Sequence, residues 1–371
     1  MRIGGTPPAR PRFRARVVPL PPRFASRVSL APRTTFGVGG PARELCDADT
    51  EATLVEALAS AEELVLLGGG SNVVVSDVGV DARVVAIATR GVALGRQGDR
   101  VLVTAAAGER WDALVVRTVD EGLAGLECLS GIPGLVGATP IQNVGAYGQE
   151  VADTIASLRA FDRETRAIAT LAPEECAFRY RDSVFKSRFP GRFVVLSVTF
   201  ALAERAPIVP KYRELEDAIA RLGAPPTLRD VRSTVVALRR AKGMVTDAAD
   251  ADSRSAGSFF TNPLLDEGGL KALRDAVGAA VTIPTFAAER GLTKVAAAWL
   301  IERAGFRKGH RHRRAAISSK HALAITNTGE ATAEEIVGLA REIRDRVRAE
   351  LGVTLHAEPV FLGFPTHPLD G

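Results

Sequence analysis

Residues 130–148 read Ser-Gly-Ile-Pro-Gly-Leu-Val-Gly-Ala-Thr-Pro-Ile-Gln-Asn-Val-Gly-Ala-Tyr-Gly, a stretch with five glycines and two prolines. Glycine reaches positive φ and lets another molecule approach the main chain, whereas proline stiffens the path between turns. A wall so poor in side chains suits a ligand held by main-chain N–H groups, above all a pyrophosphate. Taken alone, the stretch could equally be an ordinary glycine-rich surface loop.

A second glycine cluster favours the interpretation as a pyrophosphate-binding wall. Leu67-Gly68-Gly69-Gly70-Ser71-Asn72 lies between the apolar runs 64–67 and 73–75, which predicts a strand, a glycine turn and another strand. A doubly wound dinucleotide fold instead needs its glycines to open a helix. We therefore expect turn N–H groups, without a helix dipole, to hold the phosphates.

Length and composition indicate a globular protein of two or three domains. The chain has 371 residues, of which 46% are hydrophobic. No apolar run approaches the roughly 18 residues of a membrane helix, and no secretion signal is visible, so we expect a cytoplasmic protein that binds no membrane. The three cysteines are widely spaced without a C-x-x-C pair, which supports neither a disulfide framework nor a zinc site.

Positive charge is concentrated near the N-terminus. Nine of the 48 basic residues precede the first acid, Glu44, which leaves 39 against 43 acidic residues. We interpret residues 1–20 as a disordered basic extension or an overlong start, with a phosphate-binding tail as the alternative. A nucleic-acid binder is disfavoured, because this segment has no recognition motif. His310 and His312 lie in a cationic run hostile to a metal, so we expect a loop there and no metal site.

The apolar spacing predicts a mixture of helices and strands. We expect helices over 50–61, with Thr53 and Glu56 as a capping pair, over 111–119, around 296–303, and from Thr332, capped by Glu335. We expect strands over 64–67, 73–75, 84–88, 101–107, parts of 155–202, and 322–326. A polar loop over 247–255 marks a domain boundary.

Three polar residues stand out in apolar surroundings. Arg181 interrupts strand-like sequence, Ser258 lies between a glycine and two phenylalanines, and Glu358 lies in the last apolar run, which we interpret as a terminal strand. A solvated ion pair, a cap and an edge-strand position are the alternatives. A carboxylate inside such a strand is costly unless it has a partner.

Together these segments resemble the flavoenzyme family of UDP-N-acetylenolpyruvoylglucosamine reductases, also called UDP-N-acetylmuramate dehydrogenases. The resemblance covers nearly everything from Leu30 to Gly363. The segments that carry it are Thr35–Gly40, Leu67–Asn72, Gly131–Gly148, Tyr180–Lys186, Gly257–Pro263, Ala298–Glu302 and Glu358.

The resemblance implies an α+β protein: an FAD-binding fold of the vanillyl-alcohol-oxidase (PCMH) type in two subdomains, 21–90 and 91–243, plus a C-terminal α+β substrate-binding domain, 244–363, and a tail, 364–371. It implies an NADPH-dependent oxidoreductase with noncovalent FAD that acts on a CH–CH bond. The reaction would reduce the enolpyruvyl group of UDP-N-acetylglucosamine enolpyruvate to UDP-N-acetylmuramate, a step of peptidoglycan synthesis. Its partners would be the UDP-sugar and NADPH, with no nucleic acid, and we expect a monomer.

Motif matching then assigns roles to individual residues. Arg181 resembles the clamp for the substrate carboxylate, Ser258 the proton donor and Glu358 the group that polarises the developing enol. The residues expected at the cofactor are Gly68, Gly69, Gly70, Ser71, Asn72, Ser130, Gly131, Ile132, Pro133, Gly134, Gly137, Asn143, Gly145 and Tyr147. Those expected at the substrate are Tyr180, Tyr212, Lys242, Asn262 and His321.

Some positions define a subtype or depart from the family pattern. Tyr212 matches the tyrosine of the subtype with an extra loop that closes over the substrate. Thr261, Ala298 and Arg313 stand where the family often has other residues, and we expect activity to survive these changes.

The nearest rival is another flavin oxidoreductase of the same cofactor fold that uses oxygen. Such enzymes often tether the flavin through His or Cys, and here Cys128 is the sole candidate near the glycine clusters. Acid precipitation of the purified protein should leave the flavin in the supernatant, measured by its absorbance. Flavin retained in the pellet would favour the rival.

Overall fold

The N-terminal part forms a four-stranded sheet with one helix. Its strand order is β1-β2-β5-β3, and β5 runs parallel to both β2 and β3. The elements are β1 (Ala25–Ser29), β2 (Pro41–Ala48), α1 (Glu51–Ala59), β3 (Leu64–Leu67) and β5 (Val80–Ile87). The predicted capping pair of α1 is wrong by one turn, because the Thr53 N–H donates to Thr50 Oγ1 at 3.1 Å and Thr50 is therefore the cap.

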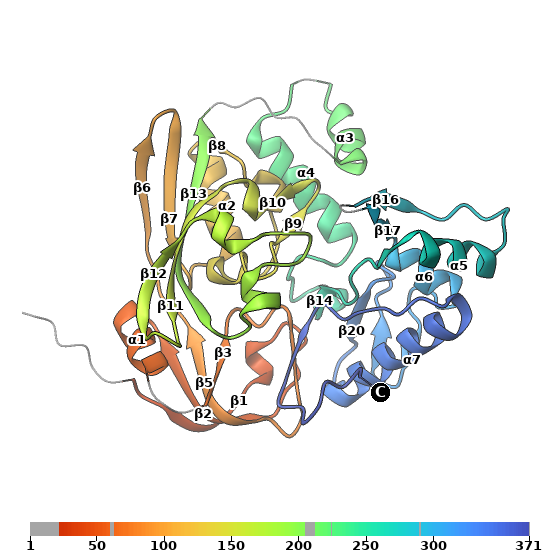
Figure 1. Cartoon of the computed structure of the whole chain (residues 1–371), viewed down its shortest axis with the longest axis horizontal. Coiled ribbons are helices and arrows are strands. Elements are labelled where there is room, and N and C mark those ends of the chain that lie inside the picture. The colour runs from red at the N-terminus through yellow and green to blue at the C-terminus, as the bar shows by residue number, and fades with distance from the viewer. Residues whose placement is uncertain (1–21, 60–62, 205–211, 224, 289–290, 371) are drawn as a thin grey trace, which may run out of the picture.

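This computed structural model describes residues 22–59, 63–204, 212–223, 225–288 and 291–370 (Figure 1). The predicted extension, 1–20, lies outside the described residues.

The middle of the chain forms a larger antiparallel sheet in the order β12-β11-β13-β7-β6, with β8 beside β13. Its strands are β6 (Val92–Gln97), β7 (Arg100–Ala106), β8 (Leu123–Ala124), β11 (Ile155–Asp162), β12 (Ala167–Leu171) and β13 (Phe193–Glu204). The helices of this part are α2 (Trp111–Asp120), α3 (Arg213–Ala220) and α4 (Leu228–Ala241), and α3 packs against α4. Trp111 joins helix and sheet, since its buried ring meets Phe200 edge-on and its Nε1–H donates to the Leu129 carbonyl.

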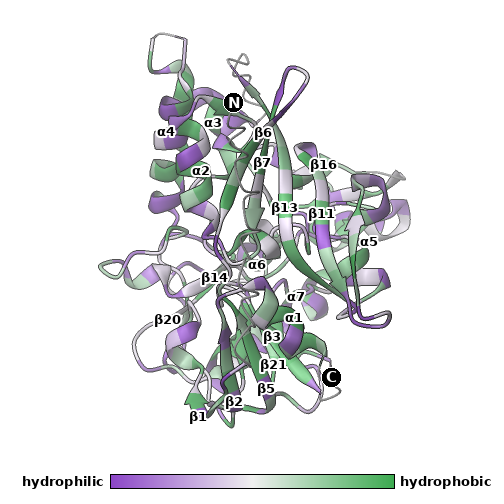
Figure 2. Cartoon of the chain, turned by 90° about the vertical axis from the view of Figure 1, so that its left-hand side faces the viewer, coloured by the Kyte–Doolittle hydropathy of each residue, from purple (hydrophilic) through white to green (hydrophobic). Residues whose placement is uncertain are grey.

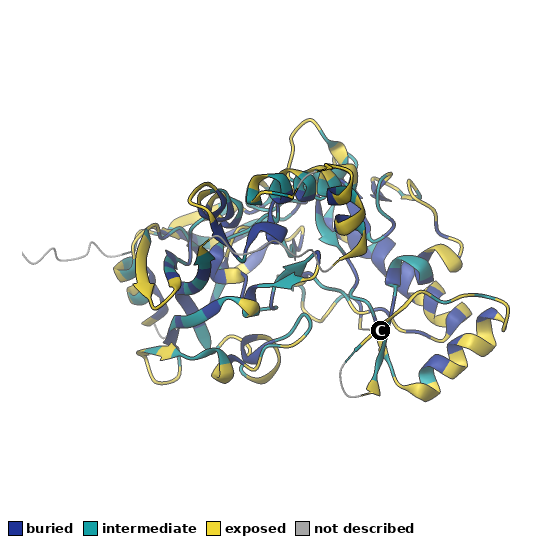
Figure 3. Cartoon of the chain, turned by 90° about the horizontal axis from the view of Figure 1, so that it is seen from above, coloured by how far each residue is buried: buried dark blue, intermediate teal, exposed yellow. Residues whose placement is uncertain are grey.

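The C-terminal part packs helices against a third sheet, in the order β14-β20-β19-β18. The sheet strands are β14 (Ser255–Ser258), β18 (Arg311–His312), β19 (Ala315–Ile317) and β20 (Ala324–Asn327). A small sheet adds β15 (Leu264–Leu265), β16 (Thr285–Ala287) and β17 (Thr293–Val295), and the helices are α5 (Glu267–Val277), α6 (Ala297–Arg303) and α7 (Ala333–Leu351). The apolar side of α7 is buried and its opposite side is exposed, as its periodicity predicts. Figure 3 shows helices with buried and exposed residues in alternation on the side of the molecule where the C-terminus lies.

The last strand returns to the beginning of the chain. β21 (Val360–Leu362) pairs in parallel with β4 (Val73–Val75), and the C-terminal core also contains Phe36 and Val38. Figure 2 shows β21 at the end of the molecule that holds β1, β2, β3 and β5. Glu358 lies two residues before β21, so its predicted place inside a terminal strand is wrong. This pairing brings Glu358 next to the first glycine cluster.

No helix within the described ranges is both long and apolar enough to cross a membrane.

The first turn of α7 depends on its cap. Thr332 accepts the Glu335 N–H through its side chain, while the Glu335 carboxylate accepts the Thr332 N–H, as the sequence predicts. Replacing Thr332 by Ala should destabilise this turn by about 1 kcal/mol, because an N–H loses its acceptor. Hydrogen exchange of the first-turn amides should then accelerate about fivefold, as that free energy implies. Thr282→Ala, at an exposed loop position, should leave those rates unchanged.

Candidate active site

The two glycine segments meet back to back. A Cβ added to Gly69 would lie 2.8 Å from the Gly134 Cα, so a side chain at either contact face would force the main chains apart. Ser71 reinforces the contact, since its hydroxyl donates to the Pro133 carbonyl at 3.3 Å. The structure thus brings together the two segments that the sequence predicts as cofactor cradles.

The two segments differ in the N–H groups that they leave available. Within the described part of the chain, the N–H groups of residues 69–72 donate to no protein acceptor. In the second segment, Gly131 N–H donates to Asp112 and Gly137 N–H donates to the Ala107 carbonyl. The N–H groups of Ile132 and Gly134 donate to no acceptor among the described residues either, so the first turn and this part of the second segment both offer donors for a pyrophosphate.

A salt bridge fixes the start of the second segment. Arg232 on α4 makes a two-pronged ion pair with Asp112 on α2, at 2.6 and 2.9 Å, while the same carboxylate accepts Gly131 N–H at 2.6 Å. Burial acts to raise the pKa of Asp112, but the hydrogen bonds from Arg232 and Gly131 outweigh it and lower the pKa. Asp112 therefore stays ionised and holds both helices to the glycine segment.

A chain of side-chain hydrogen bonds links the first glycine cluster to Glu358. Asn72 donates to Gln142 Oε1 at 3.1 Å, and Gln142 donates to Glu358 Oε1 at 3.1 Å. Asn72 also donates to the Glu358 carbonyl at 3.2 Å. The sequence analysis missed Gln142, although it lies between the glycines of the second segment and is one of its few polar side chains.

Arg181 meets Glu358 at this point. Its Nε lies 3.5 Å from Glu358 Oε1, and its Nη2 donates to the Gly145 carbonyl at 2.7 Å. The two side chains are only 22% and 15% exposed, so the pair is shielded from water but still reachable by a ligand. The predicted carboxylate clamp and the predicted polarising group are therefore neighbours.

The backbone around this pair is held in an unusual conformation. Arg181, Asn143 and Tyr147 all have φ between 45° and 54°, a left-handed region that costs side-chain-bearing residues energy. A π-helical turn, Val184–Arg188, follows Arg181 at once. Such strain persists where the surrounding structure fixes it, and it is common at functional sites.

Several residues predicted at the cofactor hold the glycine segment in place. The Asn143 side chain donates to Glu150 at 2.6 Å and to the Arg179 carbonyl, and accepts the Ala152 N–H. The buried Ser130 hydroxyl donates to the Glu127 carbonyl. Their side chains are therefore committed to the protein, which gives them a positioning role.

Ser258 reaches the site from the C-terminal sheet. β14 pairs with β20 through a register shift, and the next residue, Phe259, accepts the Glu358 N–H at 2.9 Å. The partly buried Ser258 hydroxyl has no hydrogen-bond partner among the described residues, which leaves its proton available. Arg181 and Glu358 are thus paired, and a main-chain hydrogen bond ties the residue after Ser258 to Glu358.

Tyr180, Asn262 and Lys294 lie beside Arg181. Lys294 Nζ stands 4.2 Å from the Tyr180 ring centroid, and Asn262 accepts the Ala297 N–H at the start of α6. Burial is the main cause of the lowered pKa of Lys294, and Arg181 lowers it further. Burial likewise raises the pKa of the Tyr180 hydroxyl. The sequence analysis missed Lys294, which lies on a short strand without a distinctive motif.

The remaining predicted substrate residues form a second group about Tyr147. Tyr212 packs edge-on against Tyr147 at 5.6 Å, and Lys242 pairs with Glu214 at 2.5 Å while facing the same ring. Burial raises the pKa of Tyr147 to about 12. Burial, followed by the charge of Lys242, lowers the pKa of His321 to about 4, so this imidazole is neutral at pH 7.

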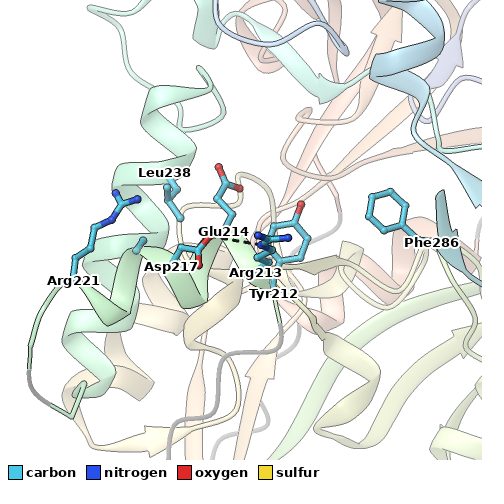
Figure 4. A pocket seen from close by; sticks show the side chains of 8 residues that line it. Tyr212, Arg213, Glu214, Asp217, Arg221, Leu238 and Phe286 are labelled. Carbon is cyan, nitrogen blue, oxygen red and sulfur yellow. Dashed lines mark ion pairs between the residues drawn. The ribbon is translucent and has the colours of Figure 1, made fainter. Parts of the chain in front are cut away.

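A groove of about 560 Å³ opens beside this second group. Figure 4 shows Phe286 on one side of Tyr212, and Glu214, Asp217, Leu238 and Arg221 on the other. The groove is lined by Tyr212, Arg213, Glu214, Asp217, Ala218, Arg221, Leu238 and Phe286. It extends the site outward from Tyr212.

Comparison with known proteins identifies the class. A family described as "FAD binding domain" matches residues 45–170. Together with the three-part fold, this match defines the chain as a flavin-dependent oxidoreductase with a separate C-terminal domain. The predicted α+β class with an FAD-binding fold is confirmed.

A second family, "UDP-N-acetylenolpyruvoylglucosamine reductase, C-terminal domain", matches residues 249–362. The reductase of Saccharopolyspora erythraea is 48% identical over 90% of this chain and 94% of its own, and that of Streptomyces coelicolor is 49% identical over 90% and 89%. The solved reductase of Thermus caldophilus is 29% identical, with a TM-score of 0.63 over 92% of this chain and 99% of its own. The chain belongs to the UDP-N-acetylenolpyruvoylglucosamine reductase family, as its motifs predict.

The contact between Gly69 and Gly134 gives a test of the cradle. Gly69→Ala should abolish FAD retention, because the new Cβ would lie 2.8 Å from backbone that cannot move without opening the site. The flavin-to-protein absorbance ratio of the purified protein measures this. Gly95→Ala, where a Cβ meets nothing within 4 Å, is the matched control and should retain its flavin. A Gly69→Ala protein with full flavin content would contradict the geometry.

Proposed function

We propose that this chain reduces the enolpyruvyl group of its UDP-sugar substrate with Arg181, Ser258 and Glu358 as the catalytic residues. The family's enzymes use FAD, with NADPH as reductant, in the synthesis of UDP-N-acetylmuramate for peptidoglycan. The two glycine segments would hold FAD, and the bound flavin would supply hydride, taken from NADPH, for the terminal alkene carbon of the substrate. The chain's own residues then have to stabilise negative charge and deliver one proton.

The observation that carries this proposal is the ion pair between Arg181 and Glu358, one main-chain hydrogen bond away from the Ser258 strand. Hydride addition leaves negative charge on the neighbouring carbon and its carboxylate. Preorganised charges in a shielded site stabilise such charge strongly. Arg181 holds the substrate carboxylate, Glu358 polarises the enol, and Ser258 delivers its proton to the neighbouring carbon.

The group of residues around Tyr147 binds the UDP-sugar in this proposal. Lys242 meets the substrate pyrophosphate, which requires exchange of its present partner Glu214, and Tyr212 closes over the substrate. Tyr180, Asn262 and His321 complete the contacts. Lys294 joins them, because a partly buried ammonium next to Tyr180 and Arg181 is suited to a second anionic group.

We also propose the domain bounds, the oligomeric state and the location of the enzyme. We place the cofactor subdomains at 21–90 and 91–243 and the substrate domain at 244–363, followed by the tail 364–371. We propose a monomeric, cytoplasmic enzyme whose partners are small molecules, of the subtype with the tyrosine loop.

If Ser258 is the proton donor, its loss should affect the reoxidation of the flavin by the substrate but not the reduction of the flavin by NADPH. In anaerobic rapid mixing, Ser258→Ala should still lose its flavin absorbance on addition of NADPH, because no proton from Ser258 is needed there. Addition of the enolpyruvyl UDP-sugar should restore the absorbance at least a hundredfold more slowly than in the unmodified enzyme, the lower end of general-acid contributions.

The controls distinguish a wrong assignment of Ser258 as proton donor from a wrong assignment of the reaction. Ser26→Ala, at an exposed position on β1, should behave as the unmodified enzyme. If Ser258→Ala reoxidises at the normal rate, Ser258 is not the donor. If the unmodified enzyme is not reoxidised by the enolpyruvyl UDP-sugar, the proposed function itself fails.

A further inference from the structure

One buried side-chain nitrogen of the described residues has no hydrogen-bond partner. Arg239, near the end of α4, donates from Nη2 to the Met244 carbonyl at 2.8 Å, but its Nε is shielded from solvent and bonds to nothing. Native proteins rarely leave such a donor unused, so each instance calls for an explanation.

The unpaired Nε faces the glycine wall. A Cβ built on Gly131 would lie 3.6 Å from it, which puts the guanidinium directly beside a residue predicted at the cofactor. Gly131 has φ of 72°, so only a residue without a side chain adopts this turn easily and leaves the approach open.

The nearby carboxylate does not neutralise Arg239. Asp112 is close enough to act on it through space, but its oxygens are taken by Arg232 and Gly131 N–H. The other charged group that acts on Arg239 at neutral pH is Arg181, which opposes its charge. Burial lowers the pKa of Arg239 to about 10, so it remains a cation at pH 7. A buried cation therefore points an unused N–H at the cofactor wall.

We propose that Arg239 is a cofactor-binding residue, whose Nε–H donates to an electron-rich oxygen of bound FAD. The acceptor is either a pyrophosphate oxygen or a carbonyl of the flavin ring, since both are oxygens that a guanidinium recognises. This inference rests on the FAD cofactor of the family and adds a residue from α4, outside both glycine segments.

The experiment compares Arg239→Gln and Arg239→Lys with the unmodified enzyme. Each holoenzyme is stripped of flavin, and FAD binding is titrated by the quenching of flavin fluorescence. Loss of a charge-assisted hydrogen bond should weaken FAD binding tenfold to a hundredfold in both variants. Arg240→Gln, at the exposed neighbouring position on the same helix, should bind FAD normally.

The reduction potential of the bound flavin distinguishes the two acceptors. If Arg239 meets the pyrophosphate, affinity falls while the potential of the bound flavin stays unchanged. If it meets the ring, the Gln variant should also have a lower potential, because a lost positive charge no longer favours the reduced, anionic flavin.

The lysine variant is the control for misfolding, because it keeps the positive charge and the aliphatic part of the arginine side chain. A folded Lys or Gln variant with unchanged FAD affinity and unchanged potential overturns this inference alone. Failure of the unmodified enzyme to bind FAD would instead overturn the cofactor assignment on which it rests.

Discussion

The contact between Gly69 and Gly134 is the constraint on which the site depends. It fixes the turn after β3 against the wall that follows α2, and side chains at this contact would separate them. The N–H groups of residues 69–72, and those of Ile132 and Gly134 in the wall, donate to no acceptor among the described residues, so the contact presents a set of main-chain donors. Asn72, next to this contact, then links it to Gln142 and Glu358.

The last strand, β21, fixes the position of Glu358 in the site. Pairing of β21 with β4 sets Glu358 beside Asn72, and Gln142 then ties the carboxylate to the second glycine segment. Arg181 closes the arrangement from a strained turn. Residues almost 290 positions apart along the chain are thus held by one continuous set of hydrogen bonds. Such fixed polar groups need little reorganisation when charge develops on a substrate.

The sequence predicted helices with a strong local periodicity, such as α2 and α7, but not α3, α4 or α5. Glycine content is also a local signal, and the two glycine-rich segments that it singled out do meet. Motif matching pointed to Arg181 and Glu358, which form an ion pair, and to Ser258, whose catalytic role stays a prediction. It misplaced Glu358 inside a strand, since the boundary of a short parallel pair depends on β4, far away in sequence. Gln142 and Lys294 escaped notice because only their tertiary neighbours distinguish them from ordinary polar residues.

Charge balance explains why so many cations gather here. Arg181 and Lys242 each pair with a carboxylate, whereas Lys294 and Arg239 lie within ion-pair distance of no acid among the described residues. Burial lowers the pKa of both cations, because the surrounding protein disfavours their charged form. An anionic ligand beside either cation would raise that pKa again, and by linkage the retained charge strengthens binding of the anion. Phosphate or carboxylate groups of a ligand beside these cations would therefore offset the cost of burying their charge.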